Sequence, residues 1–183
     1  MLFRSGKNLG PSTFSTIGDQ KKTNYALQPQ SKEEFVSAVT TGLQKAPVYF
    51  SINAKINQSG YDDVNEVVGN GSNSLALKNF KDAMKTKDVI IIDSRNADTF
   101  TNGFIPGSVS IGLEGRFAEW AGCIIPFDKP ILLVTEQGKE KETATRLARV
   151  GFDKMLGCLK GGYEAWQDVG EKSDMIKIGR AHV

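Results

Sequence analysis

Cysteine and histidine, which often serve as nucleophiles, bases and metal ligands, are scarce in this chain of 183 residues. There are two cysteines, Cys123 and Cys158, and one histidine, His182, next to the last residue. These counts exclude a histidine-rich metal site, and a lone histidine at the chain end excludes a Ser/His/Asp triad. Both cysteines lie among apolar residues, so we expect buried, structural thiols. Two cysteines cannot form a disulfide framework, which indicates a reducing, cytoplasmic compartment.

A polar loop follows one of the most apolar segments of the chain. Residues 130–135 (PILLVT) predict a buried strand, and residues 138–150 predict a helix. A helix that begins just after a strand can bind anions at its N-terminus. Over residues 135–142, however, three glutamates outnumber two lysines, and no motif places a base beside the Thr135 hydroxyl. The loop consists of Thr135, Glu136, Gln137, Gly138, Lys139 and Glu140.

Strands and helices alternate over the second part of the chain. Apolar runs predict strands at residues 88–93, 108–111, 130–135 and 155–159. Helical spacing predicts a helix capped by Ser74 and further helices near residues 117–121, 138–150 and 162–169, with Glu142 and Arg146 paired on an outer face. This alternation predicts an α/β fold, in which helices cover both faces of a parallel sheet.

The first part of the chain is predicted to be helical. Residues 13–24 have the polar pattern of a surface helix, and SKEE at 31–34 is a capping box that opens a helix to residue 44. Residues 47–50 and 54–56 predict a further short helix. The segment NGSN at 70–73 is typical of a linker, so we expect a boundary there.

Both chain ends are expected to be foreign to the natural protein. Residues 1–5 (MLFRS) and 178–183 (IGRAHV) match translations of one sequencing adapter in opposite orientations, which indicates a translated short read with truncated ends. Without Arg4 and Arg180, the net charge of +2 falls to zero and gives no indication of nucleic-acid or membrane binding.

Three motifs together resemble the rhodanese-like family. They are IDSR at 92–95, GFIPGS at 103–108 and LKGGYEAW at 159–166. The resemblance spans about residues 74–171 and departs from the family at Phe104, where a histidine is usual. It implies a rhodanese-like α/β domain in which Asp93 pairs with Arg95 or caps the next turn.

The same resemblance identifies the loop as the site of family chemistry. It places Thr135 where active members carry a persulfide-forming cysteine, and Glu140 where a basic residue is usual. A threonine oxygen cannot form a persulfide, and a carboxylate would compete with an anion for the helix N-terminus. We therefore expect no catalytic residue in this domain and no metal site.

Residues 6–60 resemble the C-terminal helices of a metallo-β-lactamase-fold hydrolase. The resemblance rests on residues 16–27, the SKEEF helix and PVYF at 47–50, and is closest to the persulfide dioxygenase and glyoxalase II-like branch that is fused to rhodanese domains. It implies an upstream hydrolase domain that holds Fe or Zn, because the H-x-H-x-D-H ligand segment is absent here. The fragment itself is expected to hold no cofactor.

The predicted protein is a catalytically inactive rhodanese-like module of a fusion in persulfide or sulfane-sulfur metabolism. Its expected partners are the metallo-β-lactamase-fold domain of the same chain and a sulfur-carrier protein or low-molecular-weight persulfide, with no nucleic acid and no membrane. Two alternatives remain open: a sulfurtransferase that uses Cys158, or a stand-alone module that binds a persulfide-bearing partner. The predicted organisation is an adapter artefact at 1–5, a helical remnant with linker at 6–72, the rhodanese-like domain at 73–172, a tail at 173–177 and an artefact at 178–183.

Overall fold

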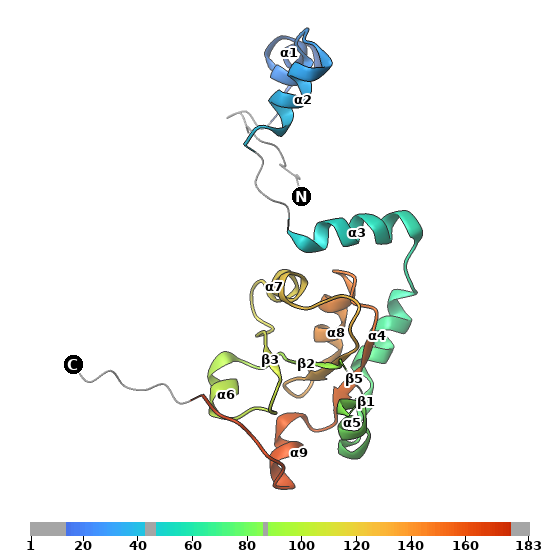
Figure 1. The fold of residues 1–183 in the computed structure, drawn as a ribbon, viewed down its shortest axis with the longest axis vertical. Coiled ribbons are helices and arrows are strands. Elements are labelled where there is room, and N and C mark those ends of the chain that lie inside the picture. Colours follow the sequence, from blue (N-terminus) through green and yellow to red (C-terminus); the bar gives the residue numbers. More distant parts are fainter. Residues whose placement is uncertain (1–13, 43–46, 86–87, 177–183) are drawn as a thin grey trace, which may run out of the picture. The chain divides into compact units, whose positions relative to one another are not determined.

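The computed structural model describes residues 14–42, 47–85 and 88–176 (Figure 1). Contacts between residues divide the chain into two units, Met1–Ala46 and Pro47–Val183. The two end segments that we expect to be adapter-derived, 1–5 and 178–183, lie outside the described residues, as does His182.

The first unit consists of short helices. They are α1 (Ile17–Thr23), a 3-10 turn (Tyr25–Leu27) and α2 (Lys32–Thr40). The predicted capping box of α2 is confirmed: the Glu34 N–H donates to Ser31 Oγ at 3.2 Å, and the Ser31 N–H donates to Glu34 Oε2 at 2.7 Å. α2 ends at Thr40, earlier than predicted, and no residue of these helices is buried.

The second unit contains a five-stranded parallel sheet, which confirms the predicted α/β fold class. The strand order is β1-β5-β4-β2-β3, with β1 at Ser74–Leu75, β2 at Ile90–Asp93, β3 at Val109–Ser110, β4 at Ile131–Val134 and β5 at Met155–Leu159. The helices are α3 (Val48–Ser59), α4 (Val64–Ser72), α5 (Leu77–Met84), α6 (Ala97–Asn102), α7 (Phe117–Ile124), α8 (Glu140–Ala148) and α9 (Gly162–Asp168). Within the described ranges, every helix is too short or too polar to cross a bilayer.

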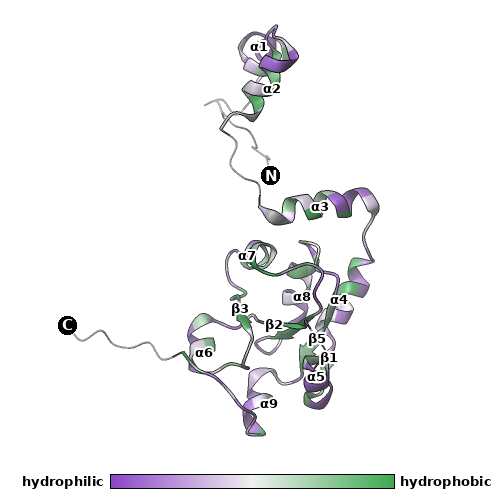
Figure 2. Cartoon of the chain, in the orientation of Figure 1, coloured by the Kyte–Doolittle hydropathy of each residue, from purple (hydrophilic) through white to green (hydrophobic). Residues whose placement is uncertain are grey.

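Helices cover both faces of the sheet because its central strands are apolar on both sides. In β4, Ile131 and Leu133 belong to one buried cluster, which includes Leu147 of α8. Leu132 and Val134 belong to the opposite cluster, with Phe80 of α5 and Tyr163 and Trp166 of α9. The strands are coloured as hydrophobic in Figure 2, as expected for a parallel sheet buried on both faces.

The linker predicted at residues 70–73 is wrong, because these residues form the end of α4 and its C-cap. Gly71 is buried, and a Cβ there would lie 2.8 Å from Met155 Sδ and 3.0 Å from the Ala144 Cβ. The glycine therefore serves close packing of α4 against β5 and α8. Ser74 begins β1 instead of capping a helix, and the following helix starts at Leu77.

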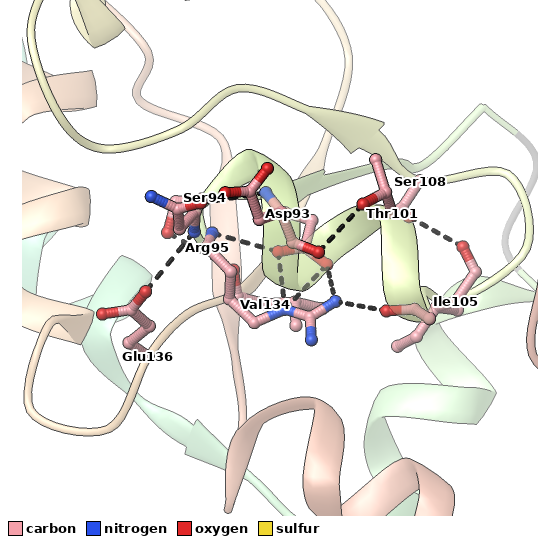
Figure 3. A network of polar contacts seen from close by, with 11 residues as sticks. Asp93, Ser94, Arg95, Thr101, Ile105, Ser108, Val134 and Glu136 are labelled. Carbon is pink, nitrogen blue, oxygen red and sulfur yellow. Dashed lines mark hydrogen bonds and ion pairs between the residues drawn. The ribbon is translucent and has the colours of Figure 1, made fainter. Parts of the chain in front are cut away.

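A buried ion pair joins the end of β2 to its surroundings (Figure 3). Arg95 Nε and Nη2 donate to the Asp93 carboxylate at 2.9 and 2.6 Å, and the Arg95 N–H donates to Asp93 Oδ1 at 3.1 Å. Arg95 Nη2 also donates to the Gly103 carbonyl at 2.9 Å, and its guanidinium lies 4.2 Å from the centre of the Tyr163 ring. Asp93 thus both pairs with Arg95 and caps the next turn, and the group ties together three segments.

Replacing Gly71 with leucine should destabilise the domain. The larger side chain overpacks the contact with Met155 and Ala144, which should lower the free energy of unfolding by about 1–3 kcal/mol. The matched control is Gly69→Leu, because a Cβ at Gly69 meets nothing within 4 Å. That change should be neutral or stabilising by up to about 1 kcal/mol, since glycine disfavours helix. Equal urea midpoints for the two variants would contradict the packing of α4.

Removing the guanidinium of Arg95 should be more costly. Arg95→Met leaves the Asp93 carboxylate buried without its partner, which should reduce the free energy of unfolding by about 3–5 kcal/mol in urea denaturation. The control is Arg116→Met at an exposed ion pair with Glu119, where we expect little or no change in the free energy of unfolding, because solvent screens the pair. A loss at Arg95 no larger than the loss at Arg116 would show that the buried pair does not hold the fold.

Candidate functional site

The candidate site lies at the carboxyl edge of the sheet, where β2 and β4 end side by side. Asp93 is paired in register with Val134, so the residues that follow these strands, Ser94 and Thr135, emerge together. The Ser94 N–H donates to the Val134 carbonyl at 2.8 Å. In open α/β sheets, ligands bind at this edge. A cavity of about 380 Å³ opens here, lined by Ser94, Asn96, Ala97, Gly112, Leu113, Glu114, Glu136 and Lys139.

Thr135 lies at the base of the loop between β4 and α8. Its side chain is buried, with 1% of the residue exposed, and its Oγ1 has no hydrogen-bond partner in the described structure. Thr135 directly follows β4, which ends at Val134.

The rest of the predicted loop turns directly into α8. Gly138 has φ +83°, a conformation that favours glycine, and its N–H donates to Glu140 Oε1 at 3.2 Å. Glu136 Oε1 accepts a hydrogen bond from the Asn96 N–H at 3.4 Å, which links the loop to the segment after β2 (Figure 3). The structure thus brings Gly138 and Glu140 together, while Gln137 is exposed.

Charged groups pair at the mouth of the loop. Lys139 Nζ lies 2.9 Å from Glu142 Oε2. This hydrogen bond raises the pKa of Lys139 and lowers the pKa of Glu142. The prediction that Glu142 pairs with Arg146 is therefore wrong, because Glu142 forms its ion pair with Lys139. Arg146 instead donates to the carbonyl oxygens of Leu113 and Gly115 and so anchors the segment that carries Glu114.

The LKGGYEAW motif at residues 159–166 packs closely against the loop between β4 and α8. Gly161 and Gly162 have φ of +78° and +64°, which makes the tight turn into α9 that the sequence predicts. A Cβ at Gly162 would lie 3.0 Å from the Thr135 carbonyl oxygen, so the turn contacts the loop closely. Phe104, at the usual histidine position, stacks on Phe100 with ring centres 4.2 Å apart, in agreement with a packing role.

The two cysteines differ from each other. Cys158 is fully buried, as predicted, and its Sγ lies 3.6 and 3.5 Å from the carbonyl oxygens of Ser72 and Asn73 at the end of α4. Burial raises the pKa of this thiol, and the charge of Glu140 raises it further. Cys123 is exposed, so its predicted burial is wrong. The apolar segment around it is a helix, α7, that buries Ala121 and leaves Cys123 on the outer side.

Sequence reasoning missed the other side of the cavity. Ser94, Asn96 and Glu114 line it, yet the sequence analysis assigned none of them to the site, although Ser94 stands within the IDSR motif. Ser94 and Asn96 could have been found, because they directly follow a predicted strand whose end must meet the end of its parallel neighbour. Ser94 Oγ also lies 3.3 Å from Thr143 Oγ1 of α8. Among residues 14–42, 47–85 and 88–176, no three His, Cys, Asp or Glu side chains gather to hold a metal ion.

Comparison with known proteins identifies a domain over the same part of the chain as the three motifs. The model of the Rhodanese-like domain family matches residues 76–169. A thiosulfate sulfurtransferase GlpE of Shewanella oneidensis is 30% identical over 95 residues, which cover 51% of this chain and 91% of that protein.

Solved structures extend the comparison. The crystal structure of the Alr3790 protein from Anabaena sp. is similar with a TM-score of 0.50 at 22% identity, over 57% of this chain and 94% of that chain. A metallo-beta-lactamase from Staphylococcus aureus is similar with a TM-score of 0.55 at 22% identity, over 84% of this chain and 42% of that chain. The fold, the motifs and the family match agree, and the chain belongs to the rhodanese-like domain family through residues 76–169.

Proposed function

We propose that this rhodanese-like domain transfers no sulfur and serves as a non-catalytic module. The observation that carries the proposal is Thr135, which directly follows β4, at the position that the family resemblance assigns to the cysteine of active members. Its oxygen cannot hold a sulfane sulfur, and its hydroxyl has no hydrogen-bonded base in the described structure. A loop without a thiol at this position would lack the atom that sulfur transfer requires.

The charges around the loop support the same proposal. Sulfurtransferase donors such as thiosulfate are anions, and a helix N-terminus favours them. Here Glu136 and Glu114 line the cavity, and Glu140 already accepts a loop N–H. An incoming dianion would meet these carboxylates before it reached Thr135, so the cavity is unfavourable for such a donor.

We further propose that the domain belongs to a fusion with a metallo-β-lactamase-fold hydrolase of persulfide or sulfane-sulfur metabolism. The structural similarity to the Staphylococcus aureus protein covers 84% of this chain, more than the span 76–169 of the family model. The helices before that span resemble the end of such a hydrolase. Fe or Zn would be held by the hydrolase domain, and the rhodanese-like module would contact that domain or dock a sulfur-carrier protein or a low-molecular-weight persulfide.

The rival function is sulfur transfer by Cys158. The Cys158 thiol has an exposed fraction of zero and lies against the carbonyl oxygens of Ser72 and Asn73. Burial raises its pKa and so disfavours the thiolate that sulfur transfer requires. These contacts favour a structural role at the end of α4.

The first prediction concerns activity. The purified chain should show no thiosulfate:cyanide sulfurtransferase activity above a buffer blank, because Thr135 cannot carry sulfane sulfur. The Shewanella oneidensis thiosulfate sulfurtransferase GlpE, assayed in parallel, provides the positive control. Turnover by the wild-type chain that disappears in Cys158→Ser would overturn the proposal and establish the rival.

The second prediction concerns the two thiols. In the native protein, Cys123 should react with an aromatic disulfide reagent within minutes, whereas Cys158 should react only after unfolding. Cys123→Ser should therefore abolish the native reaction, and Cys158→Ser should leave it unchanged. Rapid labelling of Cys158 in the folded Cys123→Ser protein would show an accessible thiol and favour the rival function.

The proposed fusion can be tested by determining the complete reading frame of the gene. The full-length reading frame should encode an H-x-H-x-D-H segment upstream of residue 14, and the expressed full-length protein should contain Fe or Zn by elemental analysis. A reading frame without such a segment would refute the fusion and leave a stand-alone module that binds a persulfide-bearing partner.

A further inference from the structure

A second cavity lies at the end of α8 that is opposite to the candidate site. It has a volume of about 600 Å³ and is bordered by α3, the connection from α3 to α4, the start of α4 and the turn after α8. α3 comes close to that turn at Gly151, where a Cβ would lie 2.7 Å from Ile56 Cδ1 and 3.3 Å from Asn53 Oδ1. Among the described residues, its lining shares none with the cavity at the candidate site. Cavities of this volume are typical of sites that hold small molecules.

The buried residues that line this cavity are apolar. Val67 of α4 and Phe152 after α8 are 6% and 1% exposed, and Ile56 of α3 is half-buried. An apolar ligand group placed on these side chains would release water from both surfaces, which favours binding. One part of the cavity therefore suits a hydrocarbon group.

Charged and amide side chains line the remainder of the cavity. Asn53 and Asn57 lie four residues apart on α3 and so on the same side of that helix. Arg149 is the C-cap of α8, and Asp62 and Asp153 supply two carboxylates. Within the part of the chain that the structure describes, these five side chains form no hydrogen bond or ion pair. They are therefore available to contact a ligand.

We propose that this cavity binds a short zwitterionic peptide with free ends and an apolar side chain. The Arg149 guanidinium donates to the carboxylate of the ligand, and Asp62 and Asp153 accept from its ammonium group. Each asparagine amide carries both a donor and an acceptor, which match the N–H and C=O of a peptide group. The apolar side chain of the ligand packs on Val67 and Phe152.

The charges of the lining favour a zwitterion over a simple ion. A ligand that is only anionic meets two carboxylates against one guanidinium, and a ligand that is only cationic leaves Arg149 without a partner. A zwitterion satisfies both signs of charge at once. The site is separate from the loop between β4 and α8, so the proposal holds whether or not that loop transfers sulfur.

The test is a titration of the 183-residue chain with the dipeptide glycyl-leucine, followed by amide NMR shifts. We expect saturable shifts at the amides of Gly151 and Phe152, while the Gly138 amide in the loop stays unchanged. Glycyl-leucinamide lacks the carboxylate, and N-acetyl-glycyl-leucine lacks the ammonium group. Each should bind at least about ten-fold more weakly than glycyl-leucine, because each loses one charge-assisted hydrogen bond.

Three variants assign the contacts. Arg149→Met should bind glycyl-leucine and its amide with equal affinity, about ten-fold below the affinity of wild type for glycyl-leucine. The matched control is Arg116→Met, which removes the same charge at the start of α7, outside the lining of the cavity, and should keep the wild-type affinity and preference. Asn57→Ala should weaken binding of all three ligands by about three- to ten-fold, since one hydrogen-bonding group is lost.

Several outcomes would overturn the proposal. They are non-saturating shifts with glycyl-leucine, equal affinities of the wild type for the dipeptide and its amide, and equal effects of Arg149→Met and Arg116→Met. The three ligands are compared on the unaltered protein, so this comparison does not depend on the folding of any variant. Thiosulfate turnover by the wild type would instead refute the proposed function, so the two failures are distinguishable.

Discussion

The Asp93–Arg95 ion pair is the constraint on which the carboxyl edge of the sheet depends. Both side chains are almost fully inaccessible to water, at 0% and 2% exposure. Charges in such a place are tolerated only when geometry and further hydrogen bonds replace the lost hydration. The guanidinium satisfies this by donating to the carboxylate and to the Gly103 carbonyl while it stacks on Tyr163. Breaking any one of these contacts would leave a buried charge partly unsatisfied.

This arrangement accounts for several residues of the family motifs through packing and hydrogen bonds alone. Gly103 has no room for a Cβ because the Tyr163 hydroxyl lies against it, and the Gly161–Gly162 turn leaves no space beside the Thr135 carbonyl. Gly103 and Tyr163 therefore serve the geometry around the ion pair, and Gly162 serves the close contact with the loop. Membership in the family thus fixes the fold, whereas activity depends on the site.

The strands and the motif contacts could be predicted because their causes are local. An apolar run such as residues 131–134 is long enough to specify a buried strand, and Ser31 with Glu34 specifies a helix start. The failures have non-local causes. Gly71 looks like a linker glycine by composition, but it is selected by contact with Met155, which is distant in sequence. The exposure of Cys123 depends on which face of α7 meets the sheet. For the candidate site, the loop was found from its strand–loop–helix pattern, while Ser94 and Asn96 needed the register of two strands.

The helices of the first unit complete the argument for a larger assembly. Ile17, Phe35 and Val36 are 80%, 41% and 46% exposed. Burying such a side chain contributes about 1.5–3 kcal/mol, yet no residue of α1 or α2 is buried. Short helices are marginal in water without a packed face, so their apolar residues require a covering surface. A hydrolase sheet of the proposed fusion would provide that surface, and it would bring a metal site into the same polypeptide as the rhodanese-like module. In such a protein, the module would function by binding the hydrolase domain or a sulfur carrier, and it would not transfer sulfur itself.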